Sequence, residues 1–283
     1  MTTILTTRPA GAADPLVARL SALGYRVAAV PTVVLEPVAS GGPLDAALTR
    51  LAELDLIVVT SPAGADAVLG ALRRTGGLSG DMTSDVPGTE GATRCRWAAV
   101  GPGTVAVLEA AGVVVDVVAS QPSGRGLAAA IAAAIAAAPG STAGVGPLPG
   151  LRILLARTDA ADRDLPDALR AVGAVVEEVV AYRTHEAPDG ARDPLRAALS
   201  DPDTRALVAA SGSAIRGAHA LLDDAGRDRL ARLPIVSIGP TTSAAIHTLG
   251  LTVAAEATAP TLDGLVAAVA AVAPPPRPLR SEP

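Results

Sequence analysis

The most constraining feature of this sequence is an internal repeat, because segments from the first half of the chain recur in the same order in the second half. Residues 4–8 (ILTTR) match residues 153–157 (ILLAR), and a glycine follows each segment at the same spacing, Gly24 in one copy and Gly173 in the other. The other matching pairs are residues 55–61 with 205–211, 97–104 with 235–242, and 122–127 with 260–265. Such self-similarity predicts that the chain uses one structural plan twice.

Each repeated unit joins a short apolar stretch to a turn rich in Gly, Pro, Ser or Thr, and then to a longer amphipathic stretch. This pattern predicts β-strands that alternate with α-helices. Short buried strands separated by helices form parallel sheets with helices on both faces. The sequence therefore predicts an α/β fold of two similar parallel-sheet lobes. Residues 74–96 and 140–150 have no counterpart in the other copy, and we expect them to form surface loops.

Composition excludes several classes of function. The 23 basic residues are all arginine, so the chain has no lysine to form a Schiff base or to complete a phosphate-binding P-loop. The net charge of −5 and the lack of a basic block argue against a nucleic acid or an anionic membrane as partner. The apolar runs at residues 127–138 and 265–273 are shorter than the roughly 20 residues that span a bilayer.

The cellular compartment is predicted from the N-terminus and the cysteine content. No signal-peptide pattern precedes Arg8. The single cysteine, Cys95, cannot form a disulfide within the chain. Both observations favour the cytoplasm.

Candidate binding residues follow the predicted strands, at the carboxyl edge where open parallel sheets bind ligands. These positions carry small, hydroxylated or arginine residues, namely Thr7, Arg8, Thr60, Ser61, Gly101, Thr104, Arg157, Ser211, Ser213, Gly239 and Thr242. A proline after Gly101 and another after Gly239 predict helices that begin there, with free amide groups that attract anions. We therefore expect the two lobes to bind a polyanion between them.

The sequence offers no pattern for a metal or a dinucleotide. His185, His219 and His247 are scattered and lack the spacing of metal ligands, so we expect no metal site. The Gly-Pro turns do not extend to the GxGxxG pattern that binds a dinucleotide.

Six short motifs together resemble the uroporphyrinogen-III synthase family. They are TRP at residues 7–9, TSP at 60–62, VGPGT at 100–104, AYRT at 181–184, SGS at 211–213 and IGPTT at 238–242. Their order and spacing match the family over about residues 2–270. The resemblance implies a bilobed fold whose lobes are joined by two strand-like crossings, near residues 35–38 and 182–184. Lobe 1 would comprise residues 1–36 with 183–271, lobe 2 residues 37–182, and a disordered tail residues 272–283.

The resemblance also implies an activity. Members of the family cyclise hydroxymethylbilane to uroporphyrinogen III, with loss of water and inversion of ring D, and they need no cofactor. The expected upstream partner is hydroxymethylbilane synthase, and we expect a monomer that binds neither nucleic acid nor a membrane. The alternative from another class is a non-catalytic tetrapyrrole-binding or regulatory protein of the same fold.

Within this resemblance, Tyr182 of the AYRT motif is the candidate proton donor to the departing hydroxyl group, and a hinge role is its alternative. The residues at the strand ends, with Ser123 added, would bind the carboxylates of the substrate. For the Ser and Thr residues the alternative is helix capping. For Arg8 and Arg157 it is an ion pair.

Overall fold

The computed structural model describes residues 2–9, 14–77, 95–119, 124–136 and 150–276. The chain divides into two compact units, which we call unit 1 (residues 1–35 and 184–283) and unit 2 (residues 36–183). Strands β3 (Val33–Pro37) and β8 (Val175–Glu186) contain the two points at which the chain passes from one unit to the other.

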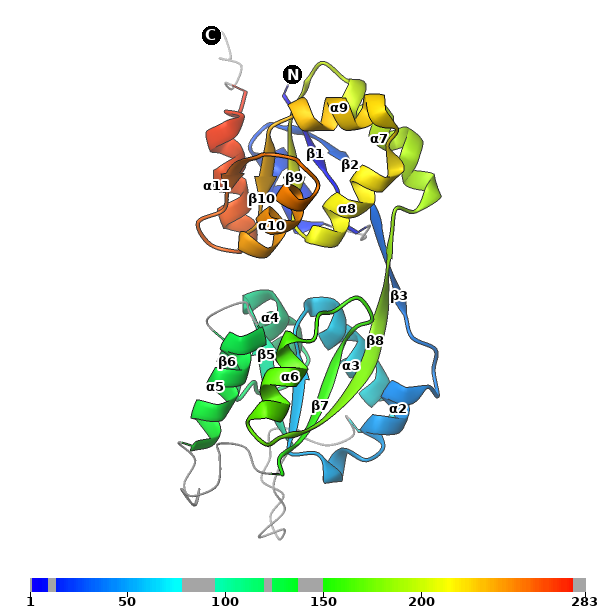
Figure 1. Ribbon diagram of the computed structural model, residues 1–283, viewed down its shortest axis with the longest axis vertical. Coiled ribbons are helices and arrows are strands. Elements are labelled where there is room, and N and C mark those ends of the chain that lie inside the picture. Colours follow the sequence, from blue (N-terminus) through cyan, green and yellow to red (C-terminus); the bar gives the residue numbers. More distant parts are fainter. Residues whose placement is uncertain (1, 10–13, 78–94, 120–123, 137–149, 277–283) are drawn as a thin grey trace, which may run out of the picture. The chain divides into compact units, whose positions relative to one another are not determined.

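Unit 1 is a five-stranded parallel sheet with helices on both faces (Figure 1). Its strands follow the spatial order β11-β10-β9-β1-β2. The elements are β1 (Thr3–Thr6), α1 (Pro15–Ala22), β2 (Arg26–Ala29), the 3-10 helix η2 (Asp189–Ala191), α7 (Arg192–Ser200), β9 (Thr204–Ala209), α8 (Gly212–Leu221), α9 (Asp224–Arg232), β10 (Ile235–Ser237), α10 (Pro240–Thr248), β11 (Val253–Glu256) and α11 (Leu262–Val272).

Unit 2 repeats this plan, with β3 added beside β8 at one edge, so that its strand order is β3-β8-β7-β4-β5-β6. The remaining elements are α2 (Pro43–Leu48), the 3-10 helix η1 (Leu51–Glu53), β4 (Leu56–Val59), α3 (Pro62–Thr75), β5 (Arg96–Val100), α4 (Pro102–Ala110), β6 (Val117–Ala119), α5 (Gly124–Ala136), β7 (Arg152–Thr158) and α6 (Asp164–Ala171). Neighbouring strands from β8 to β6 pair in parallel.

The two copies of the repeat exchange their first strands. Strand β1, from the first copy, pairs with β9 from the second copy in unit 1. Strand β7, from the second copy, pairs with β4 from the first copy in unit 2. The order β11-β10-β9-β1-β2 therefore corresponds strand for strand to β6-β5-β4-β7-β8. This arrangement confirms the predicted α/β fold of two similar parallel-sheet lobes.

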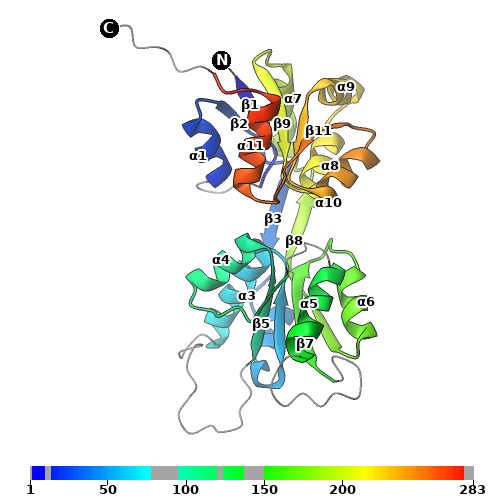
Figure 2. The ribbon, with the colours of Figure 1, turned by 90° about the vertical axis from the view of Figure 1, so that its left-hand side faces the viewer.

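Each sheet buries apolar side chains on both of its faces. In β1, Ile4 packs toward α1 and α11, and Leu5 packs toward the helices on the opposite face, which include α7 and α8. Both side chains are fully buried. In unit 2, α2, α3 and α4 cover one face of the sheet, and α5 and α6 cover the other (Figure 2). Because helices cover both faces of each sheet, the strand ends are where a ligand would reach it, and binding there stays a prediction.

The two expected surface loops and the expected C-terminal tail lie partly outside the described residues. Helix α3 runs into the expected loop 74–96 and stops at Gly76, whose positive φ of 77° closes the helix end. Residues 78–94 and most of 140–150 are outside the description. In the expected tail, Val272 is still helical and the buried Ala273 accepts a hydrogen bond of 2.6 Å from the Tyr25 hydroxyl, while residues 277–283 are not described.

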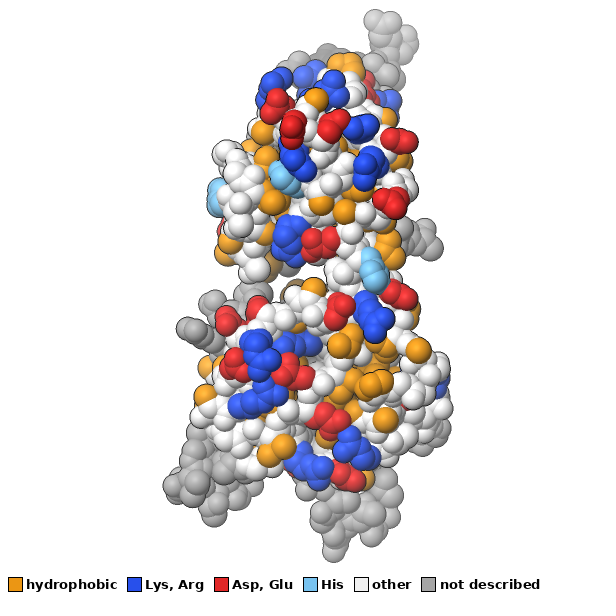
Figure 3. All heavy atoms as spheres, turned by 45° about the vertical axis from the view of Figure 1, so that its right-hand side comes forward, with side chains coloured by type: hydrophobic (Ala, Val, Ile, Leu, Met, Phe, Trp, Pro, Cys, Tyr) orange, Lys and Arg blue, Asp and Glu red, His pale blue; other side chains and the backbone are white. Residues whose placement is uncertain are grey.

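Charged side chains of both signs are interspersed on the face of each unit that Figure 3 shows. Many form ion pairs, such as Arg196 with Asp223 and Arg216 with Glu186. In the described part of the chain, no helix combines the length and the apolar character needed to cross a membrane.

Candidate functional site

Tyr182 and Ser61 meet at the carboxyl edge of the unit 2 sheet. Ser61 follows β4 and is the N-cap of α3, whereas Tyr182 belongs to β8, which lies two strands away from β4. The phenol oxygen of Tyr182 and Oγ of Ser61 are 3.0 Å apart, a hydrogen bond in which either group could donate. The structure thus brings together two of the predicted site residues from distant parts of the sequence.

An irregularity in the strand pairing helps to place Tyr182. Strands β7 and β8 pair in register as far as Arg157 and Val180, and the next pair is Thr158 with Tyr182. The extra residue, Ala181, is buried in the core beneath α3, and the ring of Tyr182 packs against that same core. Regular alternation would send neighbouring side chains to opposite faces, so the bulge allows Tyr182 to turn toward α3.

A glycine in the first turn of α3 leaves room for this contact. The Gly64 amide donates to Oγ of Ser61 over 3.1 Å. A Cβ at Gly64 would lie 3.2 Å from that Oγ, 3.4 Å from the Ala156 carbonyl oxygen and 3.8 Å from Cε1 of Tyr182. The start of α3 therefore lies directly against both members of the Ser61–Tyr182 pair.

The environment of Tyr182 keeps its phenol protonated. Burial raises the pKa of Tyr182 above its ordinary value of 10.0, the hydrogen bond with Ser61 lowers it, and the negative charge of Asp159 raises it. The net pKa is raised. At neutral pH the group therefore carries a proton that it can donate.

The other predicted residues of unit 2 that the structure describes lie at the same edge. Thr60 follows β4, and Gly101 follows the adjacent strand β5, where it is the N-cap of α4 with a φ of 75°. Thr104, in the first turn of α4, is buried. Helix α4 begins at Pro102, as predicted, and its N-cap residue, Gly101, makes no side-chain hydrogen bond to the first amides. Ser123 lies outside the described residues.

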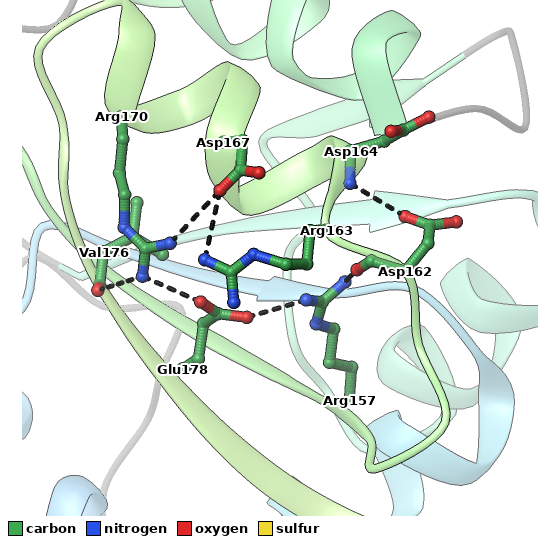
Figure 4. Close-up of polar contacts among 8 residues, drawn as sticks. All are labelled: Arg157, Asp162, Arg163, Asp164, Asp167, Arg170, Val176 and Glu178. Carbon is green, nitrogen blue, oxygen red and sulfur yellow. Dashed lines mark hydrogen bonds and ion pairs between the residues drawn. The ribbon is translucent and has the colours of Figure 1, made fainter.

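Arg157 is engaged in an ion-pair network (Figure 4). Its Nη2 atom is 2.7 Å from Oε2 of Glu178, and its Nη1 atom donates to the carbonyl oxygen of Asp162. The other carboxylate oxygen of Glu178 accepts from Arg170 over 2.7 Å. Only 10% of the Arg157 side chain is exposed. These contacts fit the ion-pair alternative for Arg157, and substrate binding by this residue stays a prediction.

Glu178 is the centre of that network. Burial raises the pKa of Glu178, but the hydrogen bonds and positive charges of Arg170 and Arg157 lower it by more, so the net pKa lies below the ordinary 4.5. The carboxylate is therefore ionised at neutral pH and holds both guanidinium groups in place.

Unit 1 presents a corresponding edge with different side chains. Ser211 is the N-cap of α8 and accepts from the Ala214 amide over 3.2 Å, while its Oγ lies 3.1 Å from Oγ of Ser213. On the adjacent strand end, Gly239 is the N-cap of α10, which begins at Pro240 as predicted, and the nearby Thr242 is buried. The backbone around Ser211 (φ −159°, ψ 155°) repeats that around Ser61 (φ −155°, ψ 154°), but its hydroxyl partner is a serine.

Two buried threonines at the end of β1 carry unsatisfied hydroxyl groups. Among the described residues, the buried side-chain oxygens without a hydrogen-bond partner are Oγ1 of Thr6 and Oγ1 of Thr7. Arg8, next in sequence, pairs with Asp14, with 2.8 Å between Nε and Oδ2. Within the described part of the chain, the Thr7 hydroxyl group therefore has no partner, whereas Arg8 forms an ion pair.

Sequence reasoning missed a further polar chain in unit 1. Ser237 and Ser243 are both buried, with 2.6 Å between their Oγ atoms, and Ser243 donates to the carboxylate of Glu256. Ser237 and Glu256 end neighbouring strands, and that position at the carboxyl edge was the available signal. In the described ranges, no group of three or more His, Cys, Asp or Glu side chains could hold a metal ion.

Comparisons with known proteins agree over most of the chain. A family model described as uroporphyrinogen-III synthase HemD matches residues 14–267. A relative named uroporphyrinogen-III synthase, from Synechococcus elongatus, is 31% identical over 272 residues, which cover 94% of each chain.

Solved structures show the same fold. A mutant uroporphyrinogen III synthase from Thermus thermophilus is 18% identical and has a TM-score of 0.57, and the match covers 94% of this chain and 96% of that one. A uroporphyrinogen-III synthetase from Helicobacter pylori is 13% identical with a TM-score of 0.56, over 94% and 97% of the two chains.

Proposed function

Because this chain belongs to the uroporphyrinogen-III synthase family, we propose that Tyr182 is the proton donor of the family's reaction in this protein. The activity is the cyclisation of hydroxymethylbilane to uroporphyrinogen III, with loss of water and inversion of ring D. The observation that carries the proposal is the position of Tyr182. Its protonated phenol is half-buried at the carboxyl edge of a parallel sheet, beside the start of α3.

The first chemical step is the loss of the hydroxyl group of hydroxymethylbilane. The phenol proton of Tyr182 passes to the departing oxygen, which leaves as water with the electron pair of the broken C–O bond. Electrons of the pyrrole nitrogen compensate for that loss, and an azafulvene cation forms. The chain then closes through a spiro intermediate that inverts ring D. In the final ring closure the attacked pyrrole loses the proton on its α-carbon and regains its aromaticity. That proton returns to the phenolate, so the net change is the loss of water.

The substrate's carboxylates are bound by the groups at the strand ends. In unit 2 these are Thr60, Gly101 and Thr104, together with the first amides of α4, to which the N-cap Gly101 offers no side chain. In unit 1 they are Ser211, Ser213, Gly239 and Thr242, together with Thr7, whose hydroxyl group has no partner among the described residues. Amide groups at helix N-termini and hydroxyl groups are suitable donors to carboxylates.

Local donors must attract the substrate, because the net charge of −5 repels a polyanion at long range. An azafulvene is intrinsically reactive, so the main task of the protein is to hold the linear tetrapyrrole in the conformation that closes with inversion. We propose that hydroxyl and amide donors at the strand ends bind the substrate, and that no cofactor takes part.

The cellular setting follows from the sequence and the chemistry. The lone Cys95 favours a reducing compartment, so we place the protein in the cytoplasm. Hydroxymethylbilane is unstable, so we expect it to be supplied by hydroxymethylbilane synthase nearby. We propose that the protein acts as a monomer.

The test uses the purified protein and freshly prepared hydroxymethylbilane, with the I and III isomers of the product resolved. We expect the III isomer from the native protein and a large loss of kcat in the Tyr182→Phe variant, which lacks only the phenolic hydroxyl. A fully active Tyr182→Phe variant would contradict the proton-donor role. Formation of the I isomer alone by the native protein would favour the non-catalytic, tetrapyrrole-binding alternative.

A further inference from the structure

The hydroxyl group of Ser61 already contacts two groups of the protein, so its role differs from that of a residue that only binds a substrate carboxylate. Its Oγ accepts from the Gly64 amide over 3.1 Å and lies 3.0 Å from the phenol oxygen of Tyr182. A hydroxyl group has one hydrogen and accepts through the lone pairs of its oxygen. With the Gly64 amide bound to one lone pair, the hydrogen of Ser61 is available for the phenol oxygen.

We infer that Ser61 is a positioning residue, which donates to the phenol oxygen of Tyr182 and leaves the phenol hydrogen free to point at the departing hydroxyl group. This inference rests on the proposed role of Tyr182 as proton donor. Ser61 then serves the catalytic acid, Tyr182, and does not bind a carboxylate of the substrate.

The same contact stabilises the product of the proton transfer. When Tyr182 gives its proton to the departing oxygen, a phenolate is left in a half-buried position, where burial disfavours a negative charge. A hydrogen bond from Ser61 to the phenolate opposes that cost, because hydrogen bonds to charged groups are stronger than those between neutral groups. The phenolate takes back a proton later, when the closed ring loses one, and Ser61 itself changes no covalent bond.

Helix α3 fixes the position of the donor. Ser61 is the N-cap of α3, and Gly64 lets the first turn of this helix lie against both side chains. The corresponding N-cap in unit 1, Ser211, has nearly the same backbone angles, yet its Oγ lies 3.1 Å from Ser213. The other tyrosine of the chain, Tyr25, precedes β2 and donates to the Ala273 carbonyl. Ser61 of unit 2 therefore pairs with a phenol, whereas the corresponding N-cap serine of unit 1 does not.

The experiment compares Ser61→Ala with Ser61→Thr and with Thr261→Ala in steady-state assays. Ser61→Ala removes both the donor and the cap, whereas Ser61→Thr keeps both. Thr261 caps α11 through the Gly264 amide in the same way and is not among the site residues, so Thr261→Ala controls for the loss of a cap. We expect Ser61→Ala to lower kcat by about 10- to 100-fold with little change in KM, and the other two variants to keep most of the native kcat.

A double-variant cycle shows whether Ser61 acts through Tyr182. In a Tyr182→Phe background, Ser61→Ala should have no further effect on kcat, because the phenol that it serves is gone. Equal effects of Ser61→Ala in the native and Tyr182→Phe backgrounds would overturn the inference. A Ser61→Ala variant with a raised KM and a native kcat would also overturn the inference, because that is the behaviour of a residue that only binds a substrate carboxylate.

A spectroscopic titration tests the contact without any activity measurement. In a Tyr25→Phe background, Tyr182 is the only tyrosine, and its ionisation is followed by ultraviolet absorbance. Because the Ser61 hydrogen bond lowers the pKa of Tyr182, Ser61→Ala should raise that pKa, and an unchanged value would overturn the inference. A fully active Tyr182→Phe variant would refute the proposed function and this inference together, whereas an inactive Tyr182→Phe with a fully active Ser61→Ala would refute only the inference.

Discussion

Gly217 of α8 packs directly on the backbone carbonyl of Thr32, so closely that a Cβ at Gly217 would lie 2.2 Å from that oxygen. The same Cβ would lie 3.0 Å from the amide nitrogen of Ala187, which itself donates to the Thr32 carbonyl over 2.9 Å. The hydroxyl group of Thr32 donates in turn to the Ala214 carbonyl of α8 over 2.6 Å. A glycine at position 217 therefore allows α8 to contact the segments that follow β2 and β8.

We expect Gly217→Ala to destabilise the protein by about 1–3 kcal/mol, even though alanine is the better helix former by about 1 kcal/mol. The added Cβ would clash with backbone atoms of Thr32 and Ala187, which cannot rotate away as a flexible side chain would. Denaturant unfolding measures the change. Gly190→Ala is the control, because apart from its immediate chain neighbours no atom of the described residues lies within 4 Å of its added Cβ. It should change the unfolding free energy by less than about 0.5 kcal/mol. Equal stability of the two variants would show that α8 does not pack as described.

The Glu178 network predicts a pH dependence of stability. The pKa of Glu178 is lower in the folded protein than its ordinary value of 4.5, so the folded state binds this proton less readily than the unfolded chain does. The stabilisation is therefore complete above the unfolded pKa and is lost as the pH falls from about 5 through the folded pKa. Glu178→Gln should be less stable than the native protein at neutral pH, and the difference should shrink on acidification. A difference that stays constant from neutral to acidic pH would contradict this role for the carboxylate.

Sequence reasoning predicted the features that depend on local pattern. The repeat and the alternation of apolar and amphipathic stretches predicted the α/β fold, and the Gly-Pro turns predicted the starts of α4 and α10, which the structure confirms. These features depend on residues that are close in sequence or on a pattern that occurs twice.

The contacts inside the site depend on long-range geometry, which the sequence pattern does not contain. Ser61 and Tyr182 are 121 positions apart, and Tyr182 directly follows the register shift between β7 and β8. Arg157 lies near the carboxyl end of the apolar strand β7, where a ligand-binding residue is expected, yet Glu178 on the neighbouring strand pairs with it. Pairing partners on adjacent strands follow from register, and a single sequence did not reveal that register.

Tyr25 offers a control for the variant at Tyr182. Its hydroxyl group donates to the Ala273 carbonyl beyond α11, and Tyr25 itself is buried. Tyr25→Phe leaves the buried Ala273 carbonyl without this donor. We therefore expect a loss of about 1–2 kcal/mol in unfolding free energy, with native kcat and KM. Thermal unfolding and the isomer-resolved assay measure the two effects. A Tyr25→Phe variant with a low kcat would show that removal of either tyrosine hydroxyl impairs catalysis through general damage to the fold.

Thr6 and Thr7 form a natural matched pair, because both have a buried Oγ1 without a partner among the described residues, but only Thr7 belongs to the predicted site. Valine has nearly the shape of threonine and removes the unsatisfied hydroxyl group, so each Thr→Val variant should be as stable as the native protein or more stable, by up to about 1–3 kcal/mol. If the Thr7 hydroxyl donates to the substrate, Thr7→Val should raise KM or lower kcat about 5- to 10-fold, whereas Thr6→Val should leave both unchanged. Unfolding experiments and steady-state kinetics on the two variants measure these effects. Equal activity of the two variants would remove Thr7 from the site, and a loss of stability in both would show that their hydroxyl groups have partners in solution.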